Sequence, residues 1–481
     1  MSVQILLYGK LLGIEDLLLA CPATGDSTSA LIGRSHWVML LSEALPRALL
    51  AEFRLARVLL GSSGGGQFLL VLPGESREAA DEFLLRAGGE IDAMSGGLLR
   101  LVWAITENLG DWSVVRRRLG EEMQRKLAAA PEAVDFVPFE PPASSSPNDG
   151  YFRELAGALW QTETAGWSPE RPAHIAIGGG KYTWSLLPDR GEDAIPLARH
   201  AAPGRNGTAP ATLEELAARA QGRKTWGVLR GDVDSMRVRI RRVHTIEDHV
   251  RLSVVYKQLF AGELSVLCSQ PEFWRKVSVL YSGGDDFAVY GSWDALIPFA
   301  REMQRVFHRF TEEMLKDFPG AEGKTITMAV ALAPDASSTL AGIHTEAGRQ
   351  LDQAKNTDKD CMALFGRVLE WRRLADAADL KDTLSRMSAE AGAAPHFLAE
   401  LGALYRKGAS LWSAHGAEQR IQRPWRFTQR LNRIVTGARE REVQKLRAHL
   451  ASEMMSRGAA QVKLRPAGLV ALEWARLSTE V

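Results

Sequence analysis

Two segments of this 481-residue chain repeat one local pattern, and the repetition limits the folds that the chain can adopt. Each segment has an apolar run, a cluster of glycines and a second apolar run; residues 56–73 contain LLGSSGGGQFLLVLP, and residues 277–291 read VSVLYSGGDDFAVYG. Glycine tolerates the positive φ values of tight turns, so both segments are predicted to be β-hairpins. The repetition indicates an internal duplication.

The surroundings of the two hairpins follow the same order. Each hairpin is preceded by a strand candidate, VQILLYG or TWGVLRGDVD, and by a segment with apolar residues at helical spacing, residues 35–52 or 246–267. A helix and a strand are predicted after each hairpin. Alternation of this kind is typical of a mixed sheet with helices on one face. The sequence therefore predicts two α+β units, at residues 1–140 and 223–370.

The rest of the chain has a different composition. Residues 141–222 are rich in Pro, Gly, Ser and Ala and contain no cysteine, which predicts a linker or insert without zinc ligands, with a hairpin at 173–187. Residues 371–481 have helical periodicity and predict a C-terminal helical domain. Their 19 Lys or Arg against 11 Asp or Glu could form a basic face for a polyanion, or could be ordinary solvated helix residues.

Overall composition excludes several classes of protein. Lys plus Arg is 59 and Asp plus Glu is 58, with 46% hydrophobic residues, so the chain is neither disordered nor a globally basic nucleic-acid coat. Cys21, Cys268 and Cys361 are isolated, which excludes a disulfide framework and a CxxC zinc knuckle. No apolar run reaches the roughly 18 residues of a membrane span. We therefore expect a cytoplasmic protein without a membrane segment.

Acidic residues stand where predicted strands end. Asp232 and Asp234 close the strand TWGVLRGDVD, and Asp285 and Asp286 follow the glycines of the second hairpin. Because this strand and hairpin are expected side by side, Asp232 can approach Asp285 and Asp286. Such carboxylates repel one another unless a divalent cation neutralises them, and oxygen-only ligands favour Mg²⁺ or Mn²⁺. We predict that Asp232, Asp285 and Asp286 are catalytic and hold two metal ions for nucleotidyl transfer.

Neighbouring residues suit a nucleotide. Gly283 and Gly284, next to Ser282, would let a triphosphate approach the backbone. The phosphate oxygens could then accept hydrogen bonds from the backbone N–H groups. Lys355 and Lys359 lie at the end of a predicted helix and could contact phosphates. The alternative is that these lysines only complement the helix dipole, and that GGDD is a solvated turn.

The chain resembles the large, polymerase-like palm subunit of type III CRISPR effector complexes. The segments that carry the resemblance are GVLRGDVDSM, LYSGGDDFAVYG and LDQAKNTDKDCMALFGRVLEW. The N-terminal YGKLLGIEDLLLA resembles the start of that family's first palm. The resemblance implies two ferredoxin-like palm domains, and synthesis of cyclic oligoadenylates from ATP when guide crRNA pairs with target RNA. It implies that Asp232, Asp285 and Asp286 hold the metals. It also implies that smaller effector subunits dock on the first palm and the C-terminal domain.

The first copy departs from the second. It reads GGGQ instead of GGDD and has Lys10 in the place of Asp232, so it lacks the carboxylates. We interpret it as a degenerate palm that either lends Ser63, Gly64 and Gly65 to a second nucleotide or only supports the active copy. The chain begins at this palm and has no His-Asp dipeptide, so the HD nuclease domain of many family members is not expected.

Two other functions are compatible with the sequence. A GGDEF-type dinucleotide cyclase is disfavoured, because the segment SMRVRIRRVHTIED lacks the expected guanine-recognition pattern. The Arg-x-x-Asp inhibitory motif is also missing just before the hairpin, where residues 275–278 read RKVS. A catalytically silent scaffold of the same ribonucleoprotein is disfavoured by the retained acids, whose mutual repulsion has no structural benefit.

Overall fold

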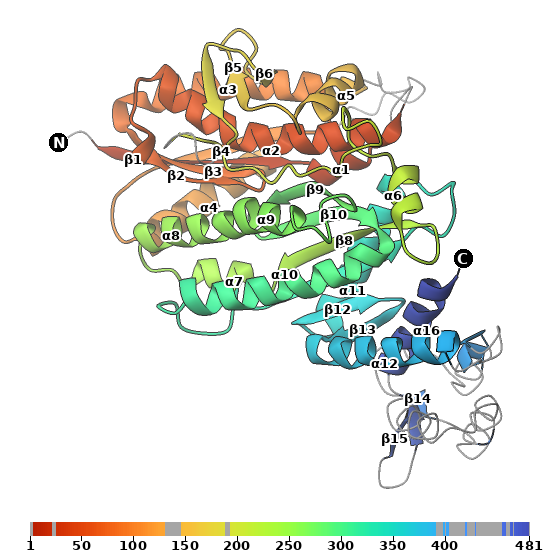
Figure 1. The fold of residues 1–481 in the computed structure, drawn as a ribbon. Coiled ribbons are helices and arrows are strands. Elements are labelled where there is room, and N and C mark those ends of the chain that lie inside the picture. The colour runs from red at the N-terminus through yellow and green to blue at the C-terminus, as the bar shows by residue number, and fades with distance from the viewer. Residues whose placement is uncertain are drawn as a thin grey trace, which may run out of the picture.

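The computed structural model describes residues 3–21, 26–129, 146–187 and 193–390, and shorter stretches beyond them: 398–399, 401–403, 419–420, 429, 455–457, 462–464 and 466–480. Figure 1 shows two sheet-containing units, one drawn in red to orange and one in green to cyan, that adjoin each other. The blue C-terminal helices lie against the second unit.

The first unit is a four-stranded sheet in the order β2-β3-β1-β4. Its strands and helices are β1 (Gln4–Leu12), α1 (Ile14–Leu19), α2 (Ser27–Glu52), β2 (Leu60–Gly64), β3 (Gln67–Pro73), α3 (Arg77–Ser95), β4 (Arg100–Glu107) and α4 (Trp112–Ala129), with short 3-10 turns η1 (Arg57–Leu59) and η2 (Gly74–Ser76) beside the hairpin.

The second unit is a six-stranded sheet in the order β13-β12-β11-β8-β10-β9. Its elements are β8 (Trp226–Val233), α7 (Met236–Arg241), α8 (Ile246–Lys257), the π-helix η3 (Gln258–Glu263), α9 (Leu264–Cys268), β9 (Val277–Gly283), β10 (Asp286–Ser292), α10 (Trp293–Met314), β11 (Ile326–Leu332), α11 (Leu340–Thr357), β12 (Cys361–Leu364) and β13 (Arg367–Glu370). The order β9-β10-β8-β11 repeats β2-β3-β1-β4. The predicted α+β fold is confirmed.

One packing detail recurs in both sheets. Gly9 on β1 is the register partner of Phe68 on β3, and Gly231 on β8 is the register partner of Phe287 on β10. In each pair the phenylalanine ring covers the glycine: an added Cβ would lie 2.2 Å from the ring of Phe68 or 2.4 Å from that of Phe287. This shared packing matches β1 to β8 and β3 to β10 residue by residue.

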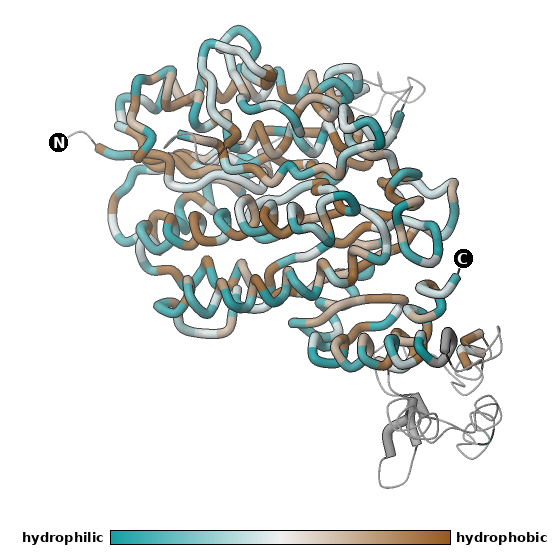
Figure 2. Tube along the Cα trace, in the orientation of Figure 1, coloured by the Kyte–Doolittle hydropathy of each residue, from teal (hydrophilic) through white to brown (hydrophobic). Residues whose placement is uncertain are grey.

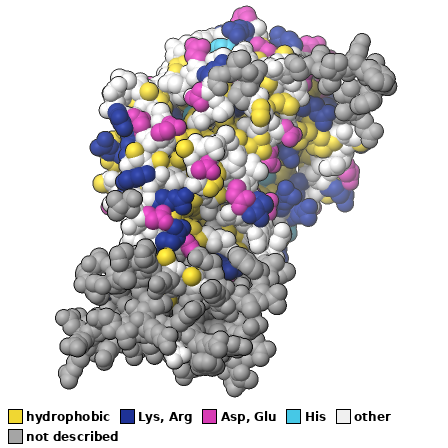
Figure 3. Space-filling model, turned by 90° about the vertical axis from the view of Figure 1, so that its right-hand side faces the viewer, with side chains coloured by type: hydrophobic (Ala, Val, Ile, Leu, Met, Phe, Trp, Pro, Cys, Tyr) yellow, Lys and Arg dark blue, Asp and Glu magenta, His cyan; other side chains and the backbone are white. Residues whose placement is uncertain are grey.

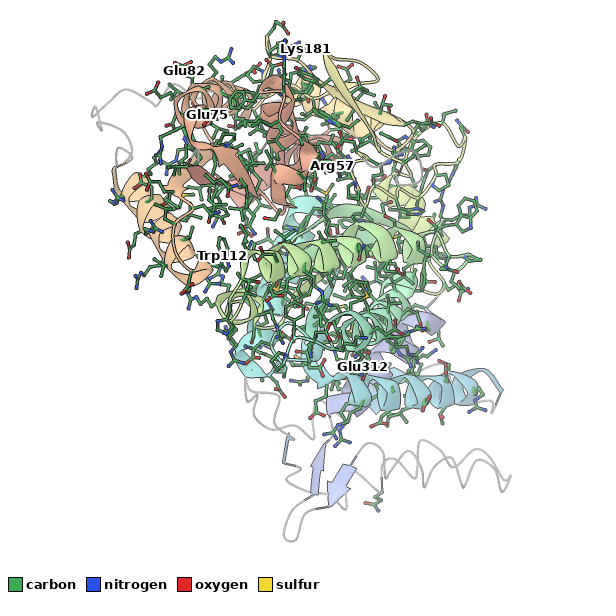
Figure 4. The ribbon with its side chains drawn as sticks, turned by 90° about the vertical axis from the view of Figure 1, so that its left-hand side faces the viewer. Arg57, Glu75, Glu82, Trp112, Lys181 and Glu312 are labelled. Atoms are coloured by element: carbon green, nitrogen blue, oxygen red, sulfur yellow. The ribbon has the colours of Figure 1, made fainter. Side chains whose placement is uncertain are left out.

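The two units interlock through their central helices. Helix α2 packs on its own sheet and also on β9 of the second unit, where the Ser35 hydroxyl donates to the Leu280 carbonyl at 2.7 Å. Conversely, α8 of the second unit packs on β2 of the first. Beside it, the Trp112 ring of α4 lies 5.2 Å from the His249 ring of α8 (Figure 4). Because α2 lies between two sheets, most of its 26 residues are buried.

The segment between the units contains α5 (Asp149–Ala158), β5 (Thr164–Trp167), β6 (Ala176–Ile177), β7 (Tyr182–Ser185) and α6 (Leu213–Arg219). Helix α5 and strand β5 pack on α2 of the first unit, whereas α6 packs on β8 and β10 of the second. A buried ion pair of 2.5 Å joins Asp149 of α5 to Arg34 of α2. The hairpin predicted at 173–187 is wrong, because β5 lies between β6 and β7 and pairs with both. A local pattern could not show that an earlier strand enters between them.

The described C-terminal residues are not only helical. Helices α12 (Trp371–Glu390) and α16 (Pro466–Thr479) pack together, but β14 (Gln419–Arg420), β15 (Met455–Arg457) and β16 (Val462–Leu464) form a small sheet. The region predicted as a C-terminal helical domain therefore also contains strands in its described part. With two or three residues each, they are too short to leave an alternating pattern in the sequence.

Hydrophobic residues gather in the interior (Figure 2), and charged residues of both signs lie on the surface (Figure 3). In Figure 2 hydrophobic residues concentrate in the strands and on the inner sides of the helices. On the face shown in Figure 3, acidic and basic side chains are interspersed over the described part. Among the described helices, none combines the length and the apolar character needed to cross a membrane.

Candidate functional site

The GGDD hairpin is a tight turn whose acids lie beside the end of β8. Gly283 and Asp286 are paired, which leaves Gly284 and Asp285 as a two-residue turn, and Gly284 has a φ of +66° that favours glycine. Asp286 is the register partner of Asp232 on β8. The backbone N–H of Val233 donates to the carbonyl of Asp285 at 2.8 Å. The turn and the end of β8 are therefore tied together.

The environment of the hairpin acids disfavours negative charge. Burial raises the pKa of Asp286 to about 7, and the neighbouring charge of Asp285 adds to this effect. Burial also raises the pKa of Asp285. The Tyr281 hydroxyl donates to the Asp286 carboxyl, and the Arg230 guanidinium donates to Tyr281. A bound cation would relieve the electrostatic cost of ionising both acids.

Asp232 has a cationic partner already. Its carboxylate forms an ion pair with the ammonium group of Lys355, near the end of α11. Lys359, after the same helix, donates to the Ser235 hydroxyl at 2.8 Å. Both lysines that were predicted to meet phosphates thus lie at the same end of β8 as Asp232.

The donor chemistry of this site fits Mg²⁺ or Mn²⁺. Asp232, Asp285 and Asp286 supply carboxylate oxygens, which hard divalent cations prefer. As the side chains stand, however, no three His, Cys, Asp or Glu side chains in the described ranges are close enough to hold one ion together. The backbone brings these acids to one place, and Asp232 would have to leave Lys355 to share an ion with the others.

The second acid at the end of β8 has a structural role. Asp234 is buried and accepts hydrogen bonds from the hydroxyls of Thr325 and Thr327, at 2.9 and 2.8 Å, and from the backbone N–H of Asp360 at 3.0 Å. Its oxygens thereby fasten β8 to β11 and to the start of β12. Strand alternation would place Asp232 and Asp234 on the same face, but β8 ends at Val233, so Asp234 lies beyond the strand and has different surroundings.

The first hairpin repeats the geometry without the acids. Gly64 pairs with Gln67, which is the register partner of Lys10. Gln67 and Lys10 therefore occupy the positions of Asp286 and Asp232. The intervening Gly65 and Gly66 have φ values of +58° and +75°.

The two glycine turns touch each other. A Cβ on Gly283 would lie 2.8 Å from the backbone nitrogen of Gly65, and a Cβ on Gly65 would lie 3.2 Å from that of Gly284. Only residues without a side chain permit this approach. The structure thus brings the predicted residues Gly65, Gly283 and Gly284 together at one point between the units.

Four further residues were not singled out by sequence reasoning. Arg230 lies two positions before Asp232, so strand alternation could have placed it on the same face of the sheet. Tyr281 directly precedes the hairpin motif. Glu43 and Lys257, which bind Ser63 of the first hairpin, come from different units, and no local signal joins them.

The family model described as the second palm domain of Cas10/Cmr2 matches residues 225–363, from the start of β8 to β12. This segment is therefore similar to the Cas10/Cmr2 palm domains. The resemblance of the chain to the large palm subunit of type III CRISPR complexes is confirmed.

Curated and structural relatives agree with this assignment. The CRISPR system single-strand-specific deoxyribonuclease Cas10/Csm1 (subtype III-A) of Mycobacterium tuberculosis (strain ATCC 25618 / H37Rv) is 28% identical over 169 residues, covering 31% of this chain and 20% of that relative. The match therefore spans about a fifth of the relative's length. A Csm1-Csm4 cassette in complex with one ATP has a TM-score of 0.71 at 17% identity. A cassette in complex with cA3 has a TM-score of 0.70 at 17% identity, and both matches cover 99% of this chain and 70% of the solved one. At this identity they show a shared fold.

Proposed function

We propose that the chain is the large subunit of a type III CRISPR effector complex and synthesises cyclic oligoadenylates from ATP when target RNA is bound. The observation that carries the proposal is the opposition of Asp232 and Asp286 beside a glycine turn that meets a second glycine turn. Solved relatives bound to ATP and to cA3 support the nucleotide class.

In this proposal the residues have distinct tasks. Asp232, Asp285 and Asp286 bind the metal ions, and Ser282, Gly283 and Gly284 accept one ATP. Mg²⁺ or Mn²⁺, when bound, would neutralise the carboxylates and favour attack of a 3′-hydroxyl on an α-phosphate, with pyrophosphate as the leaving group. The roles proposed for the remaining predicted residues are contacts with phosphates by Lys355 and Lys359, and contacts with a second nucleotide by Ser63, Gly64 and Gly65.

The proposed organisation follows the sequence prediction. It has a degenerate palm at 1–140, an insert at 141–222, a catalytic palm at 223–370 and a C-terminal domain at 371–481. Guide crRNA and target RNA reach the subunit through the complex, and smaller effector subunits dock on the first palm and C-terminal domain. The solved Csm1-Csm4 cassettes support docking of a smaller subunit.

The test is to incubate the guide-loaded complex with α-labelled ATP and Mg²⁺ or Mn²⁺, with and without matching target RNA, and to identify products by mass spectrometry. We expect cyclic adenylates only with target RNA. Replacing Asp285 and Asp286 together by alanine should abolish them, whereas Gln67→Ala, at the position equivalent to Asp286, should not. Product that survives the double replacement would refute the site.

A silent scaffold is the second candidate, because Asp232 is paired with Lys355 rather than free for a metal ion. It predicts no product under any of these conditions. A guanine-containing cyclic dinucleotide, formed when GTP is supplied as well, would instead indicate the GGDEF-type cyclase.

A further inference from the structure

A buried group of charges joins the two units next to the first hairpin. The ammonium nitrogen of Lys257, the last residue of α8, lies 2.6 Å from Oε2 of Glu43 on α2. Arg47 lies 2.7 Å from the same oxygen. The side chain of Glu43 is only 4% exposed and that of Lys257 only 22%. Because removing one partner would leave the other charge buried, this ion pair fixes α8 against α2.

The same charges hold a residue of the first hairpin. The Ser63 hydroxyl donates to Oε2 of Glu43 at 2.9 Å. Lys257 donates to the Ser63 hydroxyl at 2.9 Å and to its backbone carbonyl at 3.2 Å. Ser63 stands two residues before Gly65, at the turn. The position of the first turn therefore depends on an ammonium group that belongs to the second unit.

Three residues further along, the same helix holds the second hairpin. Lys257 is followed by η3, and the backbone carbonyl of Phe260 in this π-helix accepts a hydrogen bond of 2.5 Å from the Ser282 hydroxyl. π-Helices are rare and occur often at functional sites. Ser63 pairs with Phe68 as Ser282 pairs with Phe287, so the two serines are equivalent positions of the two hairpins.

One four-residue segment, residues 257–260, thus binds the matching serine of both hairpins. The turns that follow these serines touch through Gly65, Gly283 and Gly284. A second ion pair lies beside Glu43 and Arg47 in the first unit. Arg57 (labelled in Figure 4) is 3.0 Å from Asp193, which also lies 4.0 Å from Arg47. Displacement of the segment would move one hairpin relative to the other.

We propose that Lys257 and Glu43 are positioning residues that hold the GGDD hairpin against the first hairpin for the reaction. They touch none of the proposed metal ligands and act through Ser63 and the carbonyl of Phe260. This inference rests on the proposed function. It gives the first unit a task that needs no metal-binding carboxylates, which is to supply Glu43 as the buried acceptor for Lys257.

The test compares Lys257→Met, Lys257→Arg and the double variant Lys257→Met with Glu43→Gln in the assembled complex. The double variant removes both charges, so it keeps the test open if Lys257→Met alone fails to fold. Lys181→Met is the matched control, because Lys181 forms an exposed 2.7 Å ion pair with Glu52. Turnover and KM for ATP are measured at a temperature where each complex is folded, and hydrogen exchange of residues 282–286 is followed without nucleotide.

We expect Lys257→Met and the double variant to lower kcat at least tenfold with KM changed less than threefold, and to speed exchange at the GGDD turn. Lys257→Arg should restore part of kcat, and Lys181→Met should match the wild type in both measurements. Unchanged kcat and exchange in folded Lys257 variants would overturn the inference. A lower stability with unchanged kcat and unchanged exchange at the GGDD turn would overturn it as well. If the wild type forms no product, the proposed function fails, and the exchange measurement still decides whether Lys257 positions the turn.

Discussion

Asp232 and Asp286 lie opposite each other on β8 and β10, and the matching pair in the first sheet is Lys10 and Gln67. The duplication therefore preserved the backbone of the hairpin while only one copy carries the carboxylates. In the first copy a cation and an amide take these positions, and neither can ligate Mg²⁺ as a carboxylate does. Metal binding is thus expected only at the GGDD hairpin, and the first hairpin is expected to support it.

The two acids at the end of β8 should respond differently to removal. Asp234→Ala leaves the buried hydroxyl of Thr327, the partly buried hydroxyl of Thr325 and the N–H of Asp360 without their acceptor, so we expect the free energy of unfolding to fall by about 2–4 kcal/mol. Asp232→Ala removes only the partner of Lys355 and should cost less. Urea denaturation of the two variants measures the difference, and equal losses would contradict the structural role of Asp234.

The sequence allowed the duplicated hairpins and the approach of Asp232 to the GGDD acids to be predicted, because turn glycines and strand periodicity are local signals. It could not reveal the pairing of Asp232 with Lys355 or of Glu43 with Lys257. Those contacts join elements far apart in the chain, and their charges look like ordinary surface residues until both units are packed. The strands β14 to β16 were missed for the opposite reason, since they are too short to show a period.

The contact between the two turns makes Gly283 sensitive to a single methyl group. Its φ lies outside the left-handed region, so alanine suits its backbone, but the new Cβ would lie 2.8 Å from the nitrogen of Gly65. We expect Gly283→Ala to lower the free energy of unfolding by about 1–3 kcal/mol without any nucleotide present.

The control for that change is Gly120→Ala in α4, where nothing lies within 4 Å of the added Cβ. A helix interior favours alanine, so this variant should be stabilised by roughly 0.5–1 kcal/mol. Thermal unfolding measures both variants. If Gly283→Ala were as stable as Gly120→Ala, the two turns could not be in contact.

Lys355 should compete with divalent cations for Asp232. In EDTA, Lys355→Met leaves the Asp232 carboxylate without its cationic partner, so we expect a lower Tm than that of the wild type. Addition of Mg²⁺ should then raise the Tm of the variant more than that of the wild type, because no ammonium group has to be displaced. Equal Mg²⁺-induced shifts in both proteins would show that Lys355 and the cation do not share Asp232.

His36 should make stability depend on mild acid. This residue of α2 is buried, and neither ring nitrogen has a hydrogen-bond partner within the described part of the chain. Burial, with the charge of Arg199 adding to it, lowers the pKa of His36 from 6.5 to about 4. The unfolded chain therefore binds a proton between pH 6.5 and 4 that the folded chain does not, so stability falls as the pH falls through this window.

From these values, His36 should remove about 2 kcal/mol of the free energy of unfolding between pH 7 and pH 5. His36→Met should lack that part of the pH dependence, whereas His308→Gln, an exposed site on α10, should keep it. Urea denaturation of the three proteins at both pH values measures the difference. Parallel losses in wild type and His36→Met would mean that another group takes up the proton, and that His36 is not held neutral between the two sheets.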